Sequence, residues 1–152
     1  MVSNRLYLNR GDFAFDDVTE KADVAGEGKW CSGVALVDIN NDGLLDAFVC
    51  HDVAPNVYYI NNGDGTFCDA TKQGGEVLSE LRVSRGAAFG DLDNDGDPDL
   101  VVLGRSEPNR LFENLGGGRF REASHERGLG DPARAYGFGC RRPVQVAVLG
   151  EP

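Results

Sequence analysis

Two stretches of the chain share one pattern, in which an apolar segment, an acidic loop and a second apolar segment follow one another. Residues 33–50 read GVALVDINNDGLLDAFVC, and residues 86–104 read GAAFGDLDNDGDPDLVVLG. The second apolar segments, residues 47–50 and 100–103, are almost continuously apolar, which is typical of strands that are covered on both faces. We call each stretch an acidic strand pair, and we expect each to form two strands joined by its loop.

A second pattern occurs three times and alternates apolar and polar positions around a glycine-rich turn. NRLYLNRGDFAFDDVT at residues 4–19 returns as NVYYINNGDGTFCDAT at residues 56–71 and as NRLFENLGGGRFREAS at residues 109–124. Alternation on both sides of such a turn predicts a β-hairpin, and we call each copy a hairpin unit. Short polar segments with weak helical character follow, for example residues 18–22 and 122–126.

The two patterns together form a repeat. The hairpin units start 52 and 53 residues apart, and the acidic loops start at Asp38 and Asp91, which are also 53 residues apart. A full unit therefore holds four strands, and antiparallel four-stranded units with a period near fifty are typical of β-propeller blades. We predict an all-β fold in which residues 1–152 form a single partial propeller region, with blades at residues 33–71 and 86–124.

Both ends of the chain depart from the repeat. Residues 4–19 supply a hairpin unit with no acidic strand pair before it. Residues 136–150 begin like an acidic strand pair but contain no aspartate, so we expect a degenerate pair there and no third metal site. A composite blade made from both ends would bring the total to about three, fewer than the four that a closed propeller needs. The chain could be part of a longer protein, could self-associate, or could form an unclosed arc.

The acidic loops have the residue types of calcium-binding loops. Each places a carboxylate or carboxamide at relative positions 1, 3, 5 and 9, so that alternate side chains can point at one centre. Gly43 and Gly96, at position 6, allow the sharp turn that this requires. The backbone carbonyl at position 7 supplies one further oxygen ligand. The predicted ligands of two structural Ca²⁺ ions are Asp38, Asn40, Asp42, Leu44, Asp46, Asp91, Asp93, Asp95, Asp97 and Asp99.

Other interpretations of these loops were compared with the calcium site. An EF-hand needs a bidentate glutamate at position 12 and flanking helices, whereas position 12 is Val49 or Val102 and the flanks have a strand pattern. The remaining alternative is a metal-free turn, because Asp, Asn and Gly are common between strands. The second loop offers four carboxylates and the first offers three. Since more ligand charge generally tightens calcium binding, we hypothesise that the second loop binds more tightly.

The repeated segments resemble those of a known family. GVALVDINNDGLLDAFV, GAAFGDLDNDGDPDLVV and the NxLYxNxGDGxF hairpins are similar to FG-GAP/VCBS repeats, the blades of integrin-α-type propellers and of secreted proteins similar to cartilage acidic protein. The resemblance covers roughly residues 4–124. It implies a seven-bladed propeller with Ca²⁺ bound between the first two strands of a blade, and the blade number comes from the resemblance alone.

The charge and length of the chain exclude some classes of function. A chain of 152 residues with a formal net charge of −10 is long enough for a core but does not suit a nucleic-acid or anionic-membrane surface. No apolar run is long enough for a membrane span. No signal-peptide pattern is present, so we expect either a piece of a longer chain or a protein that is not exported by the usual route.

The four cysteines do not indicate a zinc site, because they lack the necessary spacing and the sequence has only two histidines. Cys31 precedes the first strand of an acidic strand pair, and Cys50 ends the second. These two ends lie at opposite rims unless the chain between them folds back, so the sequence leaves disulfides and free thiols open. The other two cysteines are Cys68 and Cys140.

The sequence offers little for catalysis. His51 beside Asp52 has the form of an acid–base pair, but we interpret it as part of a solvated loop. Residues 10–12, Arg-Gly-Asp, are interpreted as a hairpin turn. We therefore predict a calcium-stabilised, non-catalytic binding or adhesion scaffold, extracellular or periplasmic, that binds a protein or glycan, with no nucleic acid and no membrane insertion. The alternatives are the propeller portion of a larger extracellular enzyme and a lectin-like carbohydrate binder.

Overall fold

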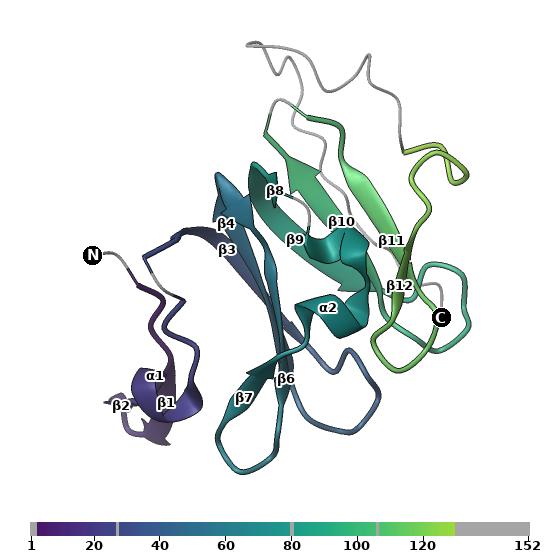
Figure 1. The fold of residues 1–152 in the computed structure, drawn as a ribbon. Helices are drawn as coiled ribbons and strands as arrows, with labels where there is room; N and C mark the ends of the chain where they lie inside the picture. The colour runs from purple at the N-terminus through teal and green to yellow at the C-terminus, as the bar shows by residue number, and fades with distance from the viewer. Residues whose placement is uncertain (1–2, 27, 80, 106, 130–152) are drawn as a thin grey trace.

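A computed structural model describes residues 3–26, 28–79, 81–105 and 107–129 of the chain. The degenerate strand pair expected at residues 136–150 lies outside these residues. Short antiparallel strands and a few single-turn helices make up the described part (Figure 1). The prediction of an all-β fold with four-stranded antiparallel sheets is confirmed.

Each acidic strand pair forms one sheet with the hairpin unit that follows it. The first sheet has the order β3-β4-β6-β7 and the second has the order β9-β10-β11-β12. All neighbouring strands are antiparallel, and Phe48 of β4 lies opposite Ala35 of β3 and Tyr58 of β6. The strands are β3 (Trp30–Val37), β4 (Asp46–Asp52), β6 (Val57–Asn61), β7 (Phe67–Asp69), β9 (Ser84–Gly90), β10 (Asp99–Gly104), β11 (Arg110–Asn114) and β12 (Phe120–Glu122).

The remaining elements are short. The first hairpin unit forms a two-stranded sheet on its own. Of the two polar segments with weak helical character, the first contains a helical turn, whereas residues 122–126 form a turn without a helix. The elements are β1 (Tyr7–Gly11), β2 (Ala14–Asp17), α1 (Thr19–Ala22), α2 (Thr71–Gly74), the 3₁₀ turn η1 (Glu76–Ser79) and the small pair β5 (Ala54–Pro55) and β8 (Leu81–Arg82).

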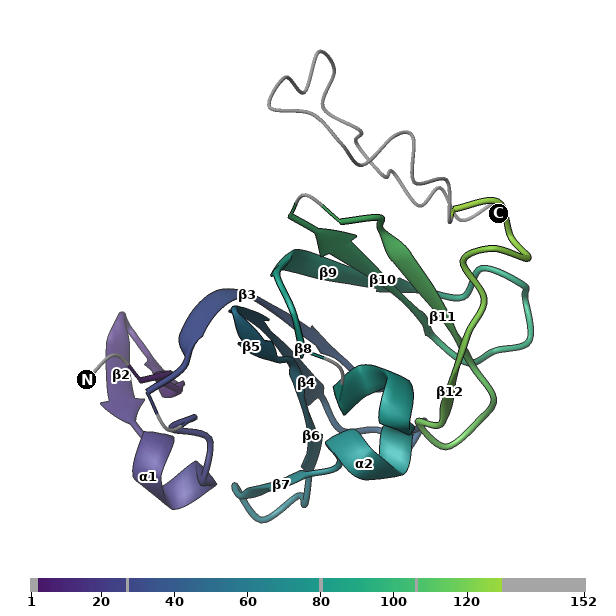
Figure 2. The same ribbon diagram turned by 45° about the horizontal axis from the view of Figure 1, so that its top comes forward.

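The main core lies between the two four-stranded sheets. Phe48 meets Phe89 edge to face, with ring centroids 6.0 Å apart, and Tyr58 meets Phe120 in the same way at 6.3 Å. Edge-to-face geometry is favourable for aromatic rings beyond the area that they bury. Hairpin β1–β2 with α1, the first sheet and the second sheet follow one another side by side (Figure 2), which is the stacking expected of consecutive blades.

A second core covers the opposite face of the first sheet. Ala22 and Val24, from α1 and the residues after it, pack against Ala47, Val49 and Val57. Strand β4 is therefore covered on both faces, which explains why its sequence is a continuous apolar run rather than an alternating one.

Small residues occur where the first strands of the two sheets approach each other. A Cβ atom added to Gly33 would lie 3.3 Å from Cα of Gly86 and 3.4 Å from the carbonyl oxygen of Arg85. These neighbours are backbone atoms, which cannot turn away as a side chain can. The close approach of β3 and β9 therefore requires glycine at position 33.

The structure at the end of the first acidic strand pair contradicts the interpretation of His51 as part of a solvated loop. Strands β3 and β4 fold back on each other, so Cys31 lies opposite His51 and Gly33 lies opposite Cys50, with a bulge between. His51 is fully buried in β4, where Nδ1 lies 2.8 Å from the carbonyl oxygen of Pro55, and burial lowers its pKa. The interpretation as a solvated loop was wrong, because His51 continues the buried strand. Cys31, Cys50 and Cys68 are free thiols.

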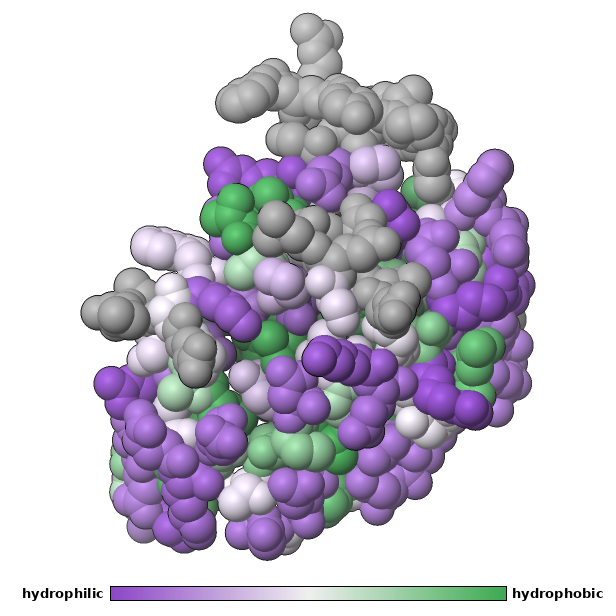
Figure 3. Space-filling view, viewed as in Figure 1, coloured by the Kyte–Doolittle hydropathy of each residue, from purple (hydrophilic) through white to green (hydrophobic). Residues whose placement is uncertain are grey.

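Hydrophilic side chains cover most of the face seen in Figure 3, with smaller hydrophobic areas between them. This agrees with the acidic composition of the chain. Among the described residues, no helix is long and apolar enough to span a membrane.

Candidate metal centre

The two acidic loops have the same backbone conformation. Asn41 and Asn94, at position 4, have left-handed φ angles of 60° and 62°. Gly43 and Gly96, at position 6, have φ angles of 86° and 91°. Asparagine and glycine are the residues that adopt this region most readily, so the Asn-Asp-Gly sequence of both loops sets the turn.

The first aspartate of each loop holds the turn closed. Asp38 accepts hydrogen bonds from the backbone N–H groups of Asp42, at 3.0 Å, and of Gly43, at 2.8 Å. Asp91 accepts the equivalent bonds from Asp95, at 3.2 Å, and from Gly96, at 3.1 Å.

The last aspartate of each loop joins the loop to the hairpin unit. Asp46 is fully buried and accepts hydrogen bonds from the N–H groups of Ile39, at 3.0 Å, and Asn61, at 2.8 Å. Asp99 is buried in the same way and accepts from Leu92 and Asn114, both at 2.9 Å. Burial raises the pKa of both carboxyls, and the backbone hydrogen bonds offset part of this rise. Each buried carboxylate therefore carries a desolvation cost that a bound cation would reduce.

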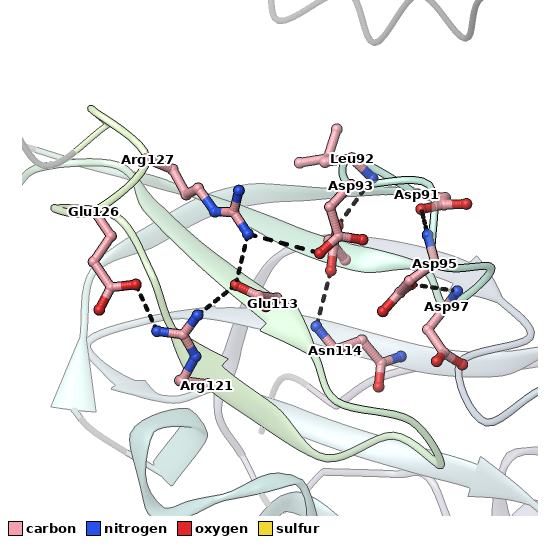
Figure 4. A network of polar contacts seen from close by, with 11 residues as sticks. Asp91, Leu92, Asp93, Asp95, Asp97, Glu113, Asn114, Arg121, Glu126 and Arg127 are labelled. Atoms are coloured by element: carbon pink, nitrogen blue, oxygen red, sulfur yellow. Dashed lines mark hydrogen bonds and ion pairs between the residues drawn. The ribbon is translucent and has the colours of Figure 1, made fainter.

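Three carboxylates of the second loop converge. One oxygen each from Asp91, Asp93 and Asp99 lies within 4.8 Å of the others, and Figure 4 shows Asp91 and Asp93 with their neighbours. Asp95 instead accepts a hydrogen bond from the N–H of Asp97 at 2.9 Å. The side chain of Asp97 also points elsewhere, as described below, although its predicted ligand atom is the carbonyl oxygen.

The first loop is less convergent. In the described part of the chain, no three of its acidic side chains come as close together as those of the second loop. Asn40 donates from Nδ2 to Asp42 at 2.9 Å, and Asp42 also accepts from the N–H of Leu44 at 2.8 Å. These predicted ligands are thus hydrogen-bonded within their own loop.

Polar contacts link the two loops across the sheet interface. Nδ2 of Asn41 donates to a carboxylate oxygen of Asp97 at 2.7 Å and to the carbonyl oxygen of Gly96 at 3.2 Å. Nδ2 of Asn114 donates to the carbonyl oxygen of Ile39 at 3.0 Å. The second loop and β11 therefore hold the first loop in place.

An arginine lies beside the convergent carboxylates. Nη2 of Arg127 is 3.7 Å from Asp93 and 3.3 Å from Glu113 (Figure 4). Glu113 also pairs with Arg121 at 2.7 Å, and Arg121 pairs with Glu126 at 2.7 Å. Asp93, Glu113 and Arg127 are among the residues that line a hollow of about 230 Å³. The second loop therefore has the positive charge of Arg127 beside its carboxylates.

The donor set suits a hard cation. Its charged groups are all carboxylates, with no thiolate or imidazole, and such oxygen ligands favour Ca²⁺, Mg²⁺ or Mn²⁺ over zinc or copper. The residues present therefore fit a hard divalent cation such as Ca²⁺, and the second loop fits one better than the first.

Comparison with known proteins gives the family. The FG-GAP-like repeat model matches three overlapping segments, residues 2–49, 38–102 and 91–140, which together cover more than half of the chain. The chain belongs to the FG-GAP-like repeat family. The resemblance inferred from the acidic strand pairs and the hairpin units is thus confirmed.

Relatives in animals share this FG-GAP-like sequence. Human cartilage acidic protein 1 is 34% identical over 133 residues, which are 84% of this chain and 20% of the relative. The mouse protein of the same name is 32% identical over 120 residues, 76% of this chain and 18% of the relative. The Xenopus tropicalis protein is 34% identical over 98 residues, 62% of this chain and 15% of the relative. The chain spans a fifth or less of these relatives.

Sequence reasoning did not assign a role to several residues of this FG-GAP-like site. Asn61 and Asn114 bind the last loop aspartates, and their recurrence at one place in the hairpin units was the available signal. Asn41 is the bridge between loops, and nothing local in the sequence indicates its partner. Arg10 and Gly11 end β1 and Asp12 begins the turn to β2, and Arg10 pairs with Asp16 at 2.7 Å.

Proposed function

We propose that this FG-GAP-like chain is a calcium-stabilised, non-catalytic module that acts as a binding or adhesion scaffold. The observation that carries the proposal is the convergence of Asp91, Asp93 and Asp99 in a loop whose backbone is repeated in the first blade. Calcium accepts six to eight oxygen ligands in flexible geometry, whereas Mg²⁺ demands near-ideal octahedral geometry and usually keeps several waters.

The proposed role of calcium is structural. A bound cation would compensate the repulsion between the three carboxylates and the cost of burying Asp99. Asp99 is also the residue that fastens the loop to β11, through the N–H of Asn114. Asn114 in turn reaches the first loop at Ile39. Calcium binding at the second loop would therefore stabilise the interface between the two blades.

We place this module outside the cell or in the periplasm. Extracellular calcium-binding modules work with dissociation constants of about 10⁻⁴–10⁻³ M, which suits exposed loops such as these. The name of the relatives refers to cartilage and to acidic character, and this chain carries a net charge of −10. Both points support the proposal.

Thermal unfolding in millimolar calcium and in chelator tests the proposal. A ligand at 100 times its dissociation constant adds about 2.7 kcal/mol to stability, which corresponds to a rise of several degrees in the melting temperature. Asp93→Asn should lose most of the calcium-dependent stabilisation that comes from the second loop, because Asp93 is a convergent carboxylate that otherwise pairs with the exposed Arg127.

Asp16→Asn is the matched control. It also removes an exposed aspartate that pairs with an arginine, but Asp16 lies in the first hairpin. The control should keep the full calcium-dependent shift. Identical melting of the unmodified protein with calcium and with chelator would contradict the proposal.

A further inference from the structure

Residues of both four-stranded sheets line a polar hollow at the end of the strands that is away from the acidic loops. Its volume is about 290 Å³. The lining comes from near the starts of β3 and β9 and from the ends of β4 and β10 or just beyond, and consists of Ser32, Asp52, Ser84, Arg85 and Arg105. Because both sheets contribute, the packing of the two blades creates this hollow.

Two residues of the lining are the bulged residues of their sheets. Neither Ser32 of β3 nor Arg85 of β9 has an opposite residue on the neighbouring strand, because the strand register shifts at each of them. They are 53 residues apart, so the bulge occurs at the same place in both blades. Bulges re-aim side chains and are over-represented next to active sites. Here each bulge places its residue in the lining of the same hollow.

The lining has a net positive charge, whereas the chain has a net charge of −10. Nη1 of Arg105 lies 3.1 Å from Asp52, and the rest of this half-exposed guanidinium keeps free N–H groups. Of the arginines whose side chains the structure describes, Arg85 alone makes neither an ion pair nor a side-chain hydrogen bond. A guanidinium binds the oxygens of an acid group in pairs, so the hollow offers donors for an anion.

Two serines and an aspartate add other polar groups. Ser84 is only 1% exposed, and its Oγ accepts a hydrogen bond from Nδ2 of Asn56 at 3.0 Å, which leaves its own O–H to donate. Ser32 donates to the carbonyl oxygen of Ser84. The carboxylate of Asp52 is an acceptor. The lining therefore combines donors for an acid group with an acceptor for a hydroxyl group.

Exposed apolar side chains flank Asp52. Trp30 is 64% exposed and lies opposite Asp52 in the register of β3 and β4, while Val53 is 74% exposed and follows it. Val53 also has a left-handed φ of 59°, which is strained for a β-branched residue, and such strain clusters at functional sites. Trp30 is thus one strand spacing from the lining and offers an apolar ring face with a polar N–H.

We propose that this hollow binds an acidic sugar, which rests on the proposed role of the chain as a binding scaffold and names its ligand class. Arg85 and the free N–H groups of Arg105 bind the carboxylate or sulfate group of the sugar. Asp52 accepts from its hydroxyl groups, Ser84 donates to a sugar oxygen, and Trp30 covers an apolar face of the ring.

Two other interpretations account for less of the lining. The carboxylate of an acidic peptide would pair with the arginines, but it has no hydroxyl group for Asp52, and the two negative charges would repel each other. A purely structural ion pair explains Arg105 and Asp52 but gives no role to Arg85 at its bulge. Ligand pockets have volumes of about 300–1,000 Å³, so a hollow at the lower end of this range suits a single sugar unit.

Three sugars that differ only at C6 test the proposal on the whole chain. Methyl glucuronide carries a carboxylate there, methyl glucoside 6-sulfate carries a sulfate, and methyl glucoside carries a hydroxyl. The amide signals of Ser32, Ser84 and Arg85 are followed by nuclear magnetic resonance at millimolar sugar. At least one acidic sugar should shift these signals and bind about tenfold more tightly than the uncharged one. The tighter of the two acidic sugars identifies the acid group.

Variants assign the binding to the named side chains. Arg85→Gln should weaken the binding of the acidic sugar by about tenfold, because it removes the charge and the paired donors. Trp30→Leu should weaken the binding of the charged and the uncharged sugar alike. Arg119→Gln is the matched control, since Arg119 is also exposed but lies at the turn between β11 and β12, and it should leave the affinity unchanged.

The proposal would be overturned if neither acidic sugar shifted these signals, or if Arg85→Gln and Arg119→Gln bound the acidic sugar equally well. Equal or tighter binding of N-acetylglutamate amide would also overturn it, by showing that an acidic peptide fills the hollow. All titrations are run in calcium and in chelator. Calcium stabilisation is judged from the melting temperatures and sugar binding from the amide signals, so the failure of one proposal is distinguished from the failure of the other.

Discussion

Replacing Arg127 should raise the calcium affinity of the second loop. Its guanidinium is 3.7 Å from Asp93, one of the convergent carboxylates. The equivalent position in the first blade is Gly74, three residues after Thr71 as Arg127 is three after Ser124, and it has no side chain. A divalent cation held by Asp93 would lie close to this positive charge. Arg127→Gln removes the competition while it keeps most of the side chain.

The size of the effect follows from Coulomb's law and exposure. Unit charges 4 Å apart interact by about 1 kcal/mol in water, and exposed ion pairs are worth about 0.2–1 kcal/mol. The side chain of Arg127 is 49% exposed and that of Asp93 is 24% exposed, so the range for exposed pairs applies. A gain at the upper end of this range, about 1 kcal/mol, corresponds to an affinity increase of about fivefold.

The positive charge of Arg127 also affects which of the two loops binds calcium more tightly. The second loop has four ligand carboxylates against three in the first, but Arg127 offsets one of the four charges. The greater affinity expected of the second loop should therefore become distinct only in Arg127→Gln.

Calorimetric titration of calcium provides the assay. Both proteins carry Asp42→Asn, which weakens the first loop so that the heat reports on the second. Arg105→Gln is the control, because Arg105 is equally exposed but pairs with Asp52 near the other end of the sheet. The gain should shrink in high salt, since screening weakens exposed charges. The reasoning would be refuted if the calcium affinity of Arg127→Gln were unchanged or weaker and that of Arg105→Gln were the same.

Two further predictions concern the hydrogen bonds of the fold. Tyr58→Phe should leave the free energy of unfolding in urea unchanged or raise it by up to about 1 kcal/mol, because the buried hydroxyl of Tyr58 has no partner among the described residues; a clear loss would contradict this. The hydroxyl of Thr19, which donates to Asp17 at 2.6 Å, lowers the pKa of that carboxyl. The resulting stability is complete above the unfolded value near 3.8 and is lost as pH falls through the lower folded pKa. Thr19→Val should raise the pKa of Asp17 in a carbon-13 titration, and an unmoved pKa would count against the assignment.

The features that the sequence predicted correctly are those with local causes. The sharp turns of the acidic loops and the hairpin turns all depend on residues a few positions apart. Short-range conformational preferences act within that distance. The period of about fifty residues then placed these elements in a common unit, and the four-stranded order followed.

The features that the sequence did not reveal depend on contacts between distant segments. Asn41 meets Asp97 across 56 residues, and Arg127 reaches a loop from beyond the end of β12. His51 was misread because polar residues close to a strand end are usually exposed, whereas β5 and Asn56 cover this one. No spacing rule relates such residues, since the partner is set by how the sheets stack.

The repeated unit leaves each blade dependent on its neighbour. The second blade supplies Phe89 to the core, accepts a hydrogen bond from Asn41 at Asp97, and donates one from Asn114 to the first loop. The polar links lie at the acidic loops, while the aromatic contact lies between the sheets. A cation that ordered the second loop would thus act on both blades at once. For the same reason an isolated blade would lose a core face and a loop support together, so stability in such a chain should grow with the number of completed interfaces.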